Sequence, residues 1–156
     1  MRIREAQLGD VAIIAEYNAR LAQETEGKEL DRATLLAGVR ALIENPARGV
    51  YFVAEEAGQV VGQVMITFEW SDWRNGTFWW LQSVYVREEF RGHGVFRSLF
   101  EHVRGLAGQE AGVCGLRLYV ERENERAKSA YRRLGMTDAG YEVFETVLAP
   151  RTAAPE

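Results

Sequence analysis

Cysteine and histidine are scarce in this chain of 156 residues, which contains one cysteine and two histidines. A single cysteine excludes a disulfide within the chain, and so few thiolate and imidazole ligands argue against a metal site. No uninterrupted apolar run approaches the roughly 18 residues that a membrane span needs, and the N-terminus contains no apolar signal region. We therefore expect a cytoplasmic protein that works without a metal ion and without a membrane.

Positive charge is also limited, because the formal net charge is −4. This balance argues against a nucleic-acid-binding surface as the main function, although a local basic patch can still hold an anionic ligand. Hydrophobic residues make up 47% of the chain, and its length suits one globular domain with a buried core. We expect one domain over residues 1–150 and a flexible tail over residues 151–156.

The most informative stretch covers residues 79–103. Its first part is rich in β-branched and aromatic side chains, which is typical of a strand. In its last part, apolar side chains recur every three or four positions, which predicts a helix with one apolar face. The two parts are joined by Arg91-Gly92-His93-Gly94. The stretch therefore predicts a strand that passes through a glycine turn directly into a helix.

A strand that enters a helix through such a turn is suited to binding an anion. Glycine lets the backbone approach a ligand closely, and the first helical turn offers N–H groups and partial positive charge. Phosphate or pyrophosphate is the natural ligand, and a plain tight turn is an equally good interpretation of this stretch alone. It is not a P-loop, because no Gly-Lys-Ser/Thr follows, and it lacks the third glycine of the dinucleotide fingerprint.

A second motif downstream favours the ligand. It reads Asn124-x-x-Ala127-x-x-x-Tyr131-x-x-x-Gly135-Met136. Together with Arg91-x-x-Gly94-x-Phe96, it resembles the paired motifs of the GNAT superfamily of acyl-CoA-dependent N-acetyltransferases, in their order and separation. Two positions depart from the family pattern. Phe96 stands where the family has a small residue, and Met136 stands where it has phenylalanine.

The resemblance implies how the chain would hold acetyl-CoA, its expected co-substrate. The backbone of Val84, Tyr85 and Val86 would bind the pantetheine arm, and Asn124 would bind the pantetheine amides. In the family, the fourth and fifth strands splay apart at their ends, and the acyl-CoA arm lies in that gap like an added strand. Here those strands correspond to residues 77–86 and 113–120.

The resemblance also implies a pyrophosphate site at the glycine turn. Its hydrogen-bond donors would be five successive backbone amides, those of Gly92, His93, Gly94, Val95 and Phe96. Arg91 and Arg97 would add positive charge nearby. His93 is more readily a spacer between two glycines than a catalytic base, because the family places the cofactor, and not the acceptor, at this turn.

The implied reaction moves the acetyl group directly to a primary amine of a small molecule or peptide within a ternary complex. By resemblance, Tyr131 is the general acid that protonates the departing CoA sulfur. It follows Asn124 by seven residues, so both lie on one helix face, and a packing role for this tyrosine is the alternative. The general base stays open between an ordered water path, Gln82 as a residue that orients it, and four carboxylates, Glu24, Glu26, Glu69 and Glu121.

The expected fold is α/β, with a mixed, mostly antiparallel, GNAT-like sheet. Its elements come in the order strand, two helices, three strands, helix, strand, helix, strand. The strands are expected over residues 1–6, 50–54, 59–68, 77–86, 113–120 and 141–148. The helices are expected over residues 10–26, 31–44, 94–107 and 124–134. The strand at residues 59–68 is apolar on both faces, which predicts a central position.

Two segments are candidates for the wall of an acceptor site. The polar residues 23–30 join the first two helices, and an acceptor wall or a solvated connector explains them equally well. Four tryptophans cluster around a hairpin, namely Trp70, Trp73, Trp79 and Trp80. Packing on the first two helices is the preferred interpretation for Trp80, whereas Trp70 and Trp73 fit an acceptor wall, a homodimer contact or packing.

Three functions compete at this point. Tyr131 favours an N-acetyltransferase, and Phe96 favours a non-catalytic acetyl-CoA sensor or an oligomerisation module with the same fold. An unrelated nucleotide-binding α/β domain is the third, and it predicts competition by ATP or NAD. Release of free thiol from acetyl-CoA across a panel of amines separates the first two functions.

Overall fold

The computed structural model describes residues 1–149 of the chain. The chain divides into two compact units, Met1–Tyr119 and Val120–Glu156, and each is described by itself. The expected tail at residues 151–156 lies outside the described residues. The expectation of a single domain over residues 1–150 stays a prediction.

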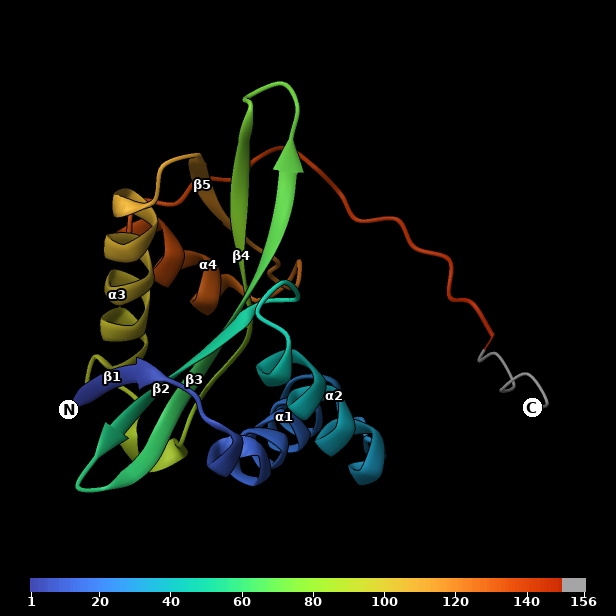
Figure 1. Ribbon diagram of the computed structural model, residues 1–156, viewed down its shortest axis with the longest axis vertical. Helices are drawn as coiled ribbons and strands as arrows, with labels where there is room; N and C mark the ends of the chain where they lie inside the picture. Colours follow the sequence, from blue (N-terminus) through green and yellow to red (C-terminus); the bar gives the residue numbers. More distant parts are fainter. Residues whose placement is uncertain (150–156) are drawn as a thin grey trace. The chain divides into compact units, whose positions relative to one another are not determined.

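The first unit is built on a mixed sheet, which confirms the expected α/β class. Its strands lie in the order β1-β2-β3-β4-β5 (Figure 1). The first three pairings are antiparallel, and β4 pairs with β5 in parallel. β3 is central, as its two apolar faces predict. The strand bounds are β1 (Arg2–Glu5), β2 (Val50–Glu56), β3 (Gln59–Ser71), β4 (Gly76–Val86) and β5 (Val113–Leu118).

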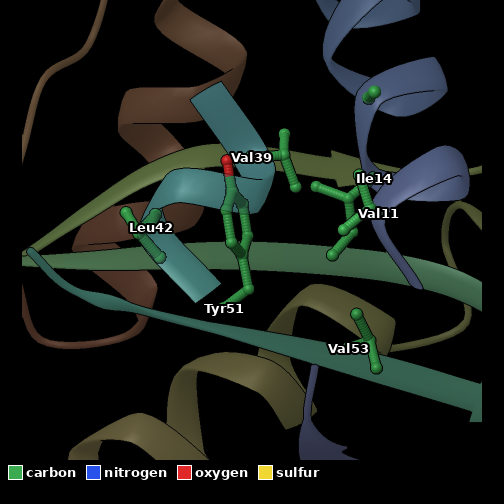
Figure 2. Close-up of a cluster of buried hydrophobic side chains, with 7 residues drawn as sticks. Val11, Ile14, Val39, Leu42, Tyr51 and Val53 are labelled. Atoms are coloured by element: carbon green, nitrogen blue, oxygen red, sulfur yellow. The ribbon is translucent and has the colours of Figure 1, made fainter. Parts of the chain in front are cut away.

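Helices cover both faces of this sheet. Figure 2 shows Tyr51 and Val53 of β2 packed with side chains of α1 (Val11–Glu26) and α2 (Arg32–Glu44). Successive side chains of a strand point to opposite faces, and Phe52, between these two, meets His102 of α3 (Val95–Gln109) with ring centroids 5.2 Å apart. α1 and α2 therefore cover one face of the sheet, and α3 covers the other.

The first two helices begin and end where the sequence predicts. Gly27 follows the last residue of α1 with a left-handed φ of 62°, a conformation that glycine adopts without steric cost. The Asp31 carboxylate caps α2 by accepting a hydrogen bond from the Thr34 amide at 2.9 Å. The segment between the two helices is consequently short and fixed at both ends.

β4 carries a bulge that sequence reasoning missed. Met65 pairs with Gln82 and Gln63 pairs with Tyr85, so Ser83 and Val84 oppose a single residue of β3. Ser83 adopts a φ of 50° at this point, and bulges of this kind bend a strand. Pairing of β4 with β5 ends at Leu81, before the bulge. The last five positions of β4 therefore extend beyond the β5 ladder, as expected for strands that splay apart.

The second unit contains α4 (Glu125–Arg133), and here one prediction is wrong. Residues 141–148 were expected to form a closing strand, but residues 141–149 adopt neither helix nor strand. Phe144 is 89% exposed and Val147 is 84% exposed. A segment rich in β-branched and aromatic side chains gives a stable strand only when a neighbouring strand pairs with it, and the described part of this unit contains no other strand.

None of the helices described in residues 1–149 is both long enough and apolar enough to cross a bilayer. In the same residues, no three His, Cys, Asp or Glu side chains gather closely enough to hold a metal ion.

Gly49 allows the chain to pass from α2 into β2 against the backbone of β3. A Cβ atom at this position would lie 2.2 Å from the carbonyl oxygen of Ile66. We expect Gly49→Ala to lower the free energy of unfolding by about 3 kcal/mol, because the clash is with backbone and cannot be relieved by a rotamer change. Gly38→Ala is the control, since a Cβ there meets nothing within 4 Å inside α2, and it is expected to stabilise by about 0.5 kcal/mol or more. Urea unfolding measures the free energy of unfolding of both variants. Equal values for Gly49→Ala and Gly38→Ala would contradict the close approach of Gly49 to the backbone of β3.

Candidate functional site

The glycine turn has the predicted geometry. A short 3-10 helix, η2 (Glu88–Phe90), leads into it from β4. Gly92 and Gly94 have φ of 79° and 80°, values that glycine adopts readily. α3 begins directly after Gly94, one residue later than predicted. The backbone amide of Ser98 donates a hydrogen bond to the Gly94 carbonyl at 3.0 Å. The first turn of α3 thus follows the glycines immediately, an arrangement suited to an anion.

Arg91 is held against the protein by two side-chain hydrogen bonds. Its Nε donates to the Val86 carbonyl at 2.8 Å, and its Nη2 donates to Glu24 Oε2 at 2.8 Å. The other oxygen of this carboxylate, Oε1, accepts from the Tyr85 hydroxyl at 3.0 Å. The contact joins the end of α1 to the glycine turn. Sequence reasoning missed it because Glu24 and Arg91 stand 67 residues apart.

Tyr85 anchors the end of β4 on the face that α1 covers. Its side chain is only 4% exposed, and its ring centroid lies 5.0 Å from that of Tyr17 in α1. Burial raises the pKa of both hydroxyls above the ordinary tyrosine value. The Tyr17 hydroxyl donates to the Val60 carbonyl. The side chain of Tyr85 is therefore structural, and its backbone is the part that can face a ligand.

A buried amide fixes the bulge in β4. Gln63 is fully buried in β3, and its Nε2 donates to the Ser83 carbonyl at 3.1 Å and to Asn18 Oδ1 at 2.8 Å. Asn18 Nδ2 in turn donates to the Tyr51 hydroxyl at 3.3 Å. Sequence reasoning missed this network. The available signal was Gln63 itself, a polar residue within a strand whose neighbours are apolar on both faces.

A cavity of about 340 Å³ opens beside this network, between α1, α2 and the bulge. We call it the α1–α2 cavity. It is lined by polar and apolar side chains, namely Asn18, Leu21, Ala22, Thr25, Glu26, Leu30, Leu35 and Ser83. Three of these residues belong to residues 23–30, the segment for which an acceptor wall and a solvated connector were equally good predictions. Glu24 and Glu26 belong to the last turn of α1, not to the connection after it.

The other candidates for a general base have partners within the structure. Arg117 Nη1 donates to Glu69 Oε1 at 2.6 Å, and Gln82 Nε2 donates to Thr67 Oγ1 at 2.6 Å. In the second unit, Glu121 accepts a hydrogen bond from the backbone amide of Glu123 at 2.9 Å. Each group is therefore already engaged by its own neighbours.

The second motif forms α4 of the second unit. Asn124 caps this helix, its Oδ1 accepting from the Ala127 amide at 3.0 Å. Gly135 follows the helix with a left-handed φ of 89°, the predicted stop. Tyr131 is half-buried, and burial raises the pKa of its hydroxyl. At neutral pH this tyrosine is therefore protonated, as a general acid must be.

The tryptophans divide into packed and exposed pairs. Trp80 stacks on Tyr119 with ring centroids 4.5 Å apart, so it is packed as expected, and its packing on the first two helices stays a prediction. Trp79 meets Phe68 edge-on at 6.2 Å. Trp70 is 63% exposed and Trp73 is 87% exposed. These last two, near the tip of the β3–β4 hairpin, are available to a ligand or partner.

Comparisons with solved structures extend over nearly the whole chain. A possible acetyltransferase from Clostridium difficile 630 is 45% identical, with 95% of this chain and 97% of that chain covered and a TM-score of 0.89. A predicted acetyltransferase from Clostridium acetobutylicum was solved with acetyl-CoA. It is 17% identical, with 93% of this chain and 95% of that chain covered and a TM-score of 0.76, which shows likeness of fold alone.

A curated relative matches about half of the chain, and a family model matches the region of both motifs. Thialysine N-epsilon-acetyltransferase of Bos taurus is 35% identical over 79 residues, which are 51% of this chain and 45% of the bovine protein. The match therefore spans about half of each protein. The model of the acetyltransferase (GNAT) family matches residues 13–136, from α1 to the end of the second motif. The chain belongs to the acetyltransferase (GNAT) family.

Proposed function

We propose that this protein is an acetyl-CoA-dependent N-acetyltransferase that moves the acetyl group directly to a primary amine of a small molecule or peptide. The observation that carries the proposal is the glycine turn, which leads from the end of β4 into the first turn of α3. Membership of the family and the 45% identity to a possible acetyltransferase support it. Activity on an amine goes beyond these comparisons and is the part to be tested.

The cofactor site is proposed along β4 and the glycine turn. Pairing with β5 stops at Leu81, so Val84, Tyr85 and Val86 would offer their backbone to the pantetheine arm as an added strand would. The pyrophosphate would then lie at the turn. The donors proposed for it are the backbone amides of Gly92, His93, Gly94, Val95 and Phe96.

The charge proposed for the pyrophosphate site comes from Arg91 and Arg97. The Arg91 guanidinium also binds Glu24 and the Val86 carbonyl, so part of its charge is neutralised within the protein. We therefore give the backbone amides the larger share of cofactor binding. His93 is proposed as a spacer. It lies exposed between the two glycines.

Transfer of the acetyl group needs an acid for the sulfur and a neutral amine. We propose Tyr131, whose hydroxyl is protonated at neutral pH, as the acid. We propose Asn124 as a ligand of the pantetheine amides through its Nδ2, since its Oδ1 caps α4. For removal of the amine proton we favour an ordered water path, because Glu24 and Glu69 are each already bound to an arginine of the protein.

Release of free CoA thiol in the presence of an amine panel tests this function. Acetylated amine detected by mass spectrometry, formed in equal amount to the thiol, is the expected result. Tight CoA binding with no thiol release from any amine would favour the sensor or oligomerisation module. Displacement of CoA by ATP or NAD would favour a nucleotide-binding domain instead.

Phe96 departs from the family motif, and we expect that its bulky side chain does not block CoA binding. Its ring lies 6.2 Å from that of Phe100, one helical turn further along α3, so the side chain can pack along the helix while its amide faces the turn. Phe96→Ala should therefore change CoA affinity by about threefold or less. Calorimetry on both proteins measures it. If the substitution creates binding that the native protein lacks, the native chain is a degenerate family member and not an enzyme.

A further inference from the structure

The α1–α2 cavity has a polar floor that is fixed before any ligand arrives. Asn18 and Ser83 line it, and both are bound by the fully buried side chain of Gln63, at 2.8 Å and 3.1 Å. Groups held in this way lose little conformational entropy on binding. Ser83 immediately precedes residues 84–86, where the proposed function places the pantetheine arm. The floor therefore lies next to the proposed position of the pantetheine arm, which carries the acetyl group at its end.

The walls of the cavity suit an aliphatic chain. Leu21, Leu30 and Leu35 line it from α1, the connecting segment and α2. Asn18 and Glu26, both lining residues, stand eight positions apart in α1, a rise of about 12 Å along the helix. A linear ligand can thus reach from the floor past the leucines toward Glu26.

The charge of the lining has one sign. Glu26 is its single ionisable side chain, and the lining includes no arginine or lysine. Glu26 Oε2 lies 3.8 Å from Lys28 Nζ, and the side chains of Lys28 and Glu26 are 65% and 59% exposed. Ion pairs this exposed contribute little. The cavity therefore favours a cationic group near Glu26 and disfavours a carboxylate.

We propose that the α1–α2 cavity binds a linear aliphatic diamine that carries no carboxylate, and that Glu26 determines this preference. The proposal rests on the proposed function, because it makes the cavity the acceptor site. One amine would lie at the floor formed by Asn18 and Ser83 as the acetyl acceptor. The methylene chain would pack on the leucines, and the second amine, as an ammonium, would pair with Glu26.

A matched pair of acceptors tests the preference. Cadaverine and lysine have the same chain between two amines and differ by the carboxylate of lysine. We expect kcat/KM to be at least about tenfold higher for cadaverine, since juxtaposed like charges are strongly disfavoured. Glu26→Gln should lower kcat/KM for cadaverine by about threefold, because an ion pair at this exposed carboxylate contributes modestly. The value for lysine should stay unchanged or rise.

Two further variants control the test. Glu44→Gln removes an exposed carboxylate at the end of α2, outside the cavity lining, and should leave the ratio of the two acceptors unchanged. Lys28→Ala should also leave it unchanged. Equal values for cadaverine and lysine would overturn the proposal. So would a preference for lysine that Lys28→Ala abolishes, because Lys28 would then bind the carboxylate.

The cavity can also be tested apart from turnover. If acetyl-CoA binds but no amine releases thiol, the proposed function fails. Calorimetry then measures the binding of cadaverine and of lysine to the CoA-bound protein. This measurement tests the proposed amine site without any turnover. Binding of cadaverine that is weakened in Glu26→Gln supports the proposal. Binding that is unchanged in Glu26→Gln, or no binding of cadaverine, overturns it.

Discussion

Gly94→Asp is expected to lower the affinity of the protein for CoA by about 100-fold, because a carboxylate beside the pyrophosphate costs several kcal/mol. Gly94 precedes the first residue of α3 with a φ of 80°, and a Cβ atom there meets nothing within 4 Å. The aspartate side chain therefore fits without a steric clash. It would bring its negative charge to the first-turn amides that the pyrophosphate is proposed to use.

The control for this variant is Gly94→Asn, which has the same shape without the charge. Asparagine and aspartate both tolerate left-handed backbone better than other side chains, so both variants carry a similar backbone cost. Calorimetry with CoA should give an affinity for Gly94→Asn between those of the native protein and Gly94→Asp. Unchanged affinity in a folded Gly94→Asp protein, checked by circular dichroism, would place the pyrophosphate elsewhere.

Tyr131→Phe is expected to lower kcat by about 100-fold, the low end of what general acid–base catalysis contributes. The substitution removes the hydroxyl and keeps the ring. Loss of the proton donor should appear in kcat more than in KM, since its hydrogen bond forms chiefly as the sulfur leaves. CoA binding should persist, because the turn amides and Asn124 are proposed to carry it.

Tyr141→Phe is the matched control, as it removes the hydroxyl of a tyrosine that is 71% exposed in the same unit. Its kcat should equal that of the native protein. Both are measured with the best amine of the panel under conditions where chemistry limits the rate. A native value of kcat in Tyr131→Phe would remove this residue from the mechanism and leave the second motif as a packing element.

The sequence by itself determined those features that depend on a few neighbouring residues. The cap of α2 at Asp31, the left-handed stops at Gly27 and Gly135, and the glycine turn all appear where short patterns predict them. Local conformational preference and capping chemistry act within one helical turn. The order of strands and helices from β1 to α4 followed from hydrophobic periodicity for the same reason, and with it the α/β class.

The tertiary structure alone decided which distant side chains meet. The Glu24–Arg91 contact spans 67 residues and the Gln63–Asn18 contact spans 45, so no local pattern encodes either of them. The bulge at Ser83 shifts the register of β4 against β3, and the α1–α2 cavity exists because two helices and this bulge converge. The expected strand at residues 141–148 failed because a strand depends on a partner outside its own segment. Its β-branched and aromatic side chains favour a strand, but only the fold could supply a neighbouring strand, and residues 141–149 adopt no regular secondary structure.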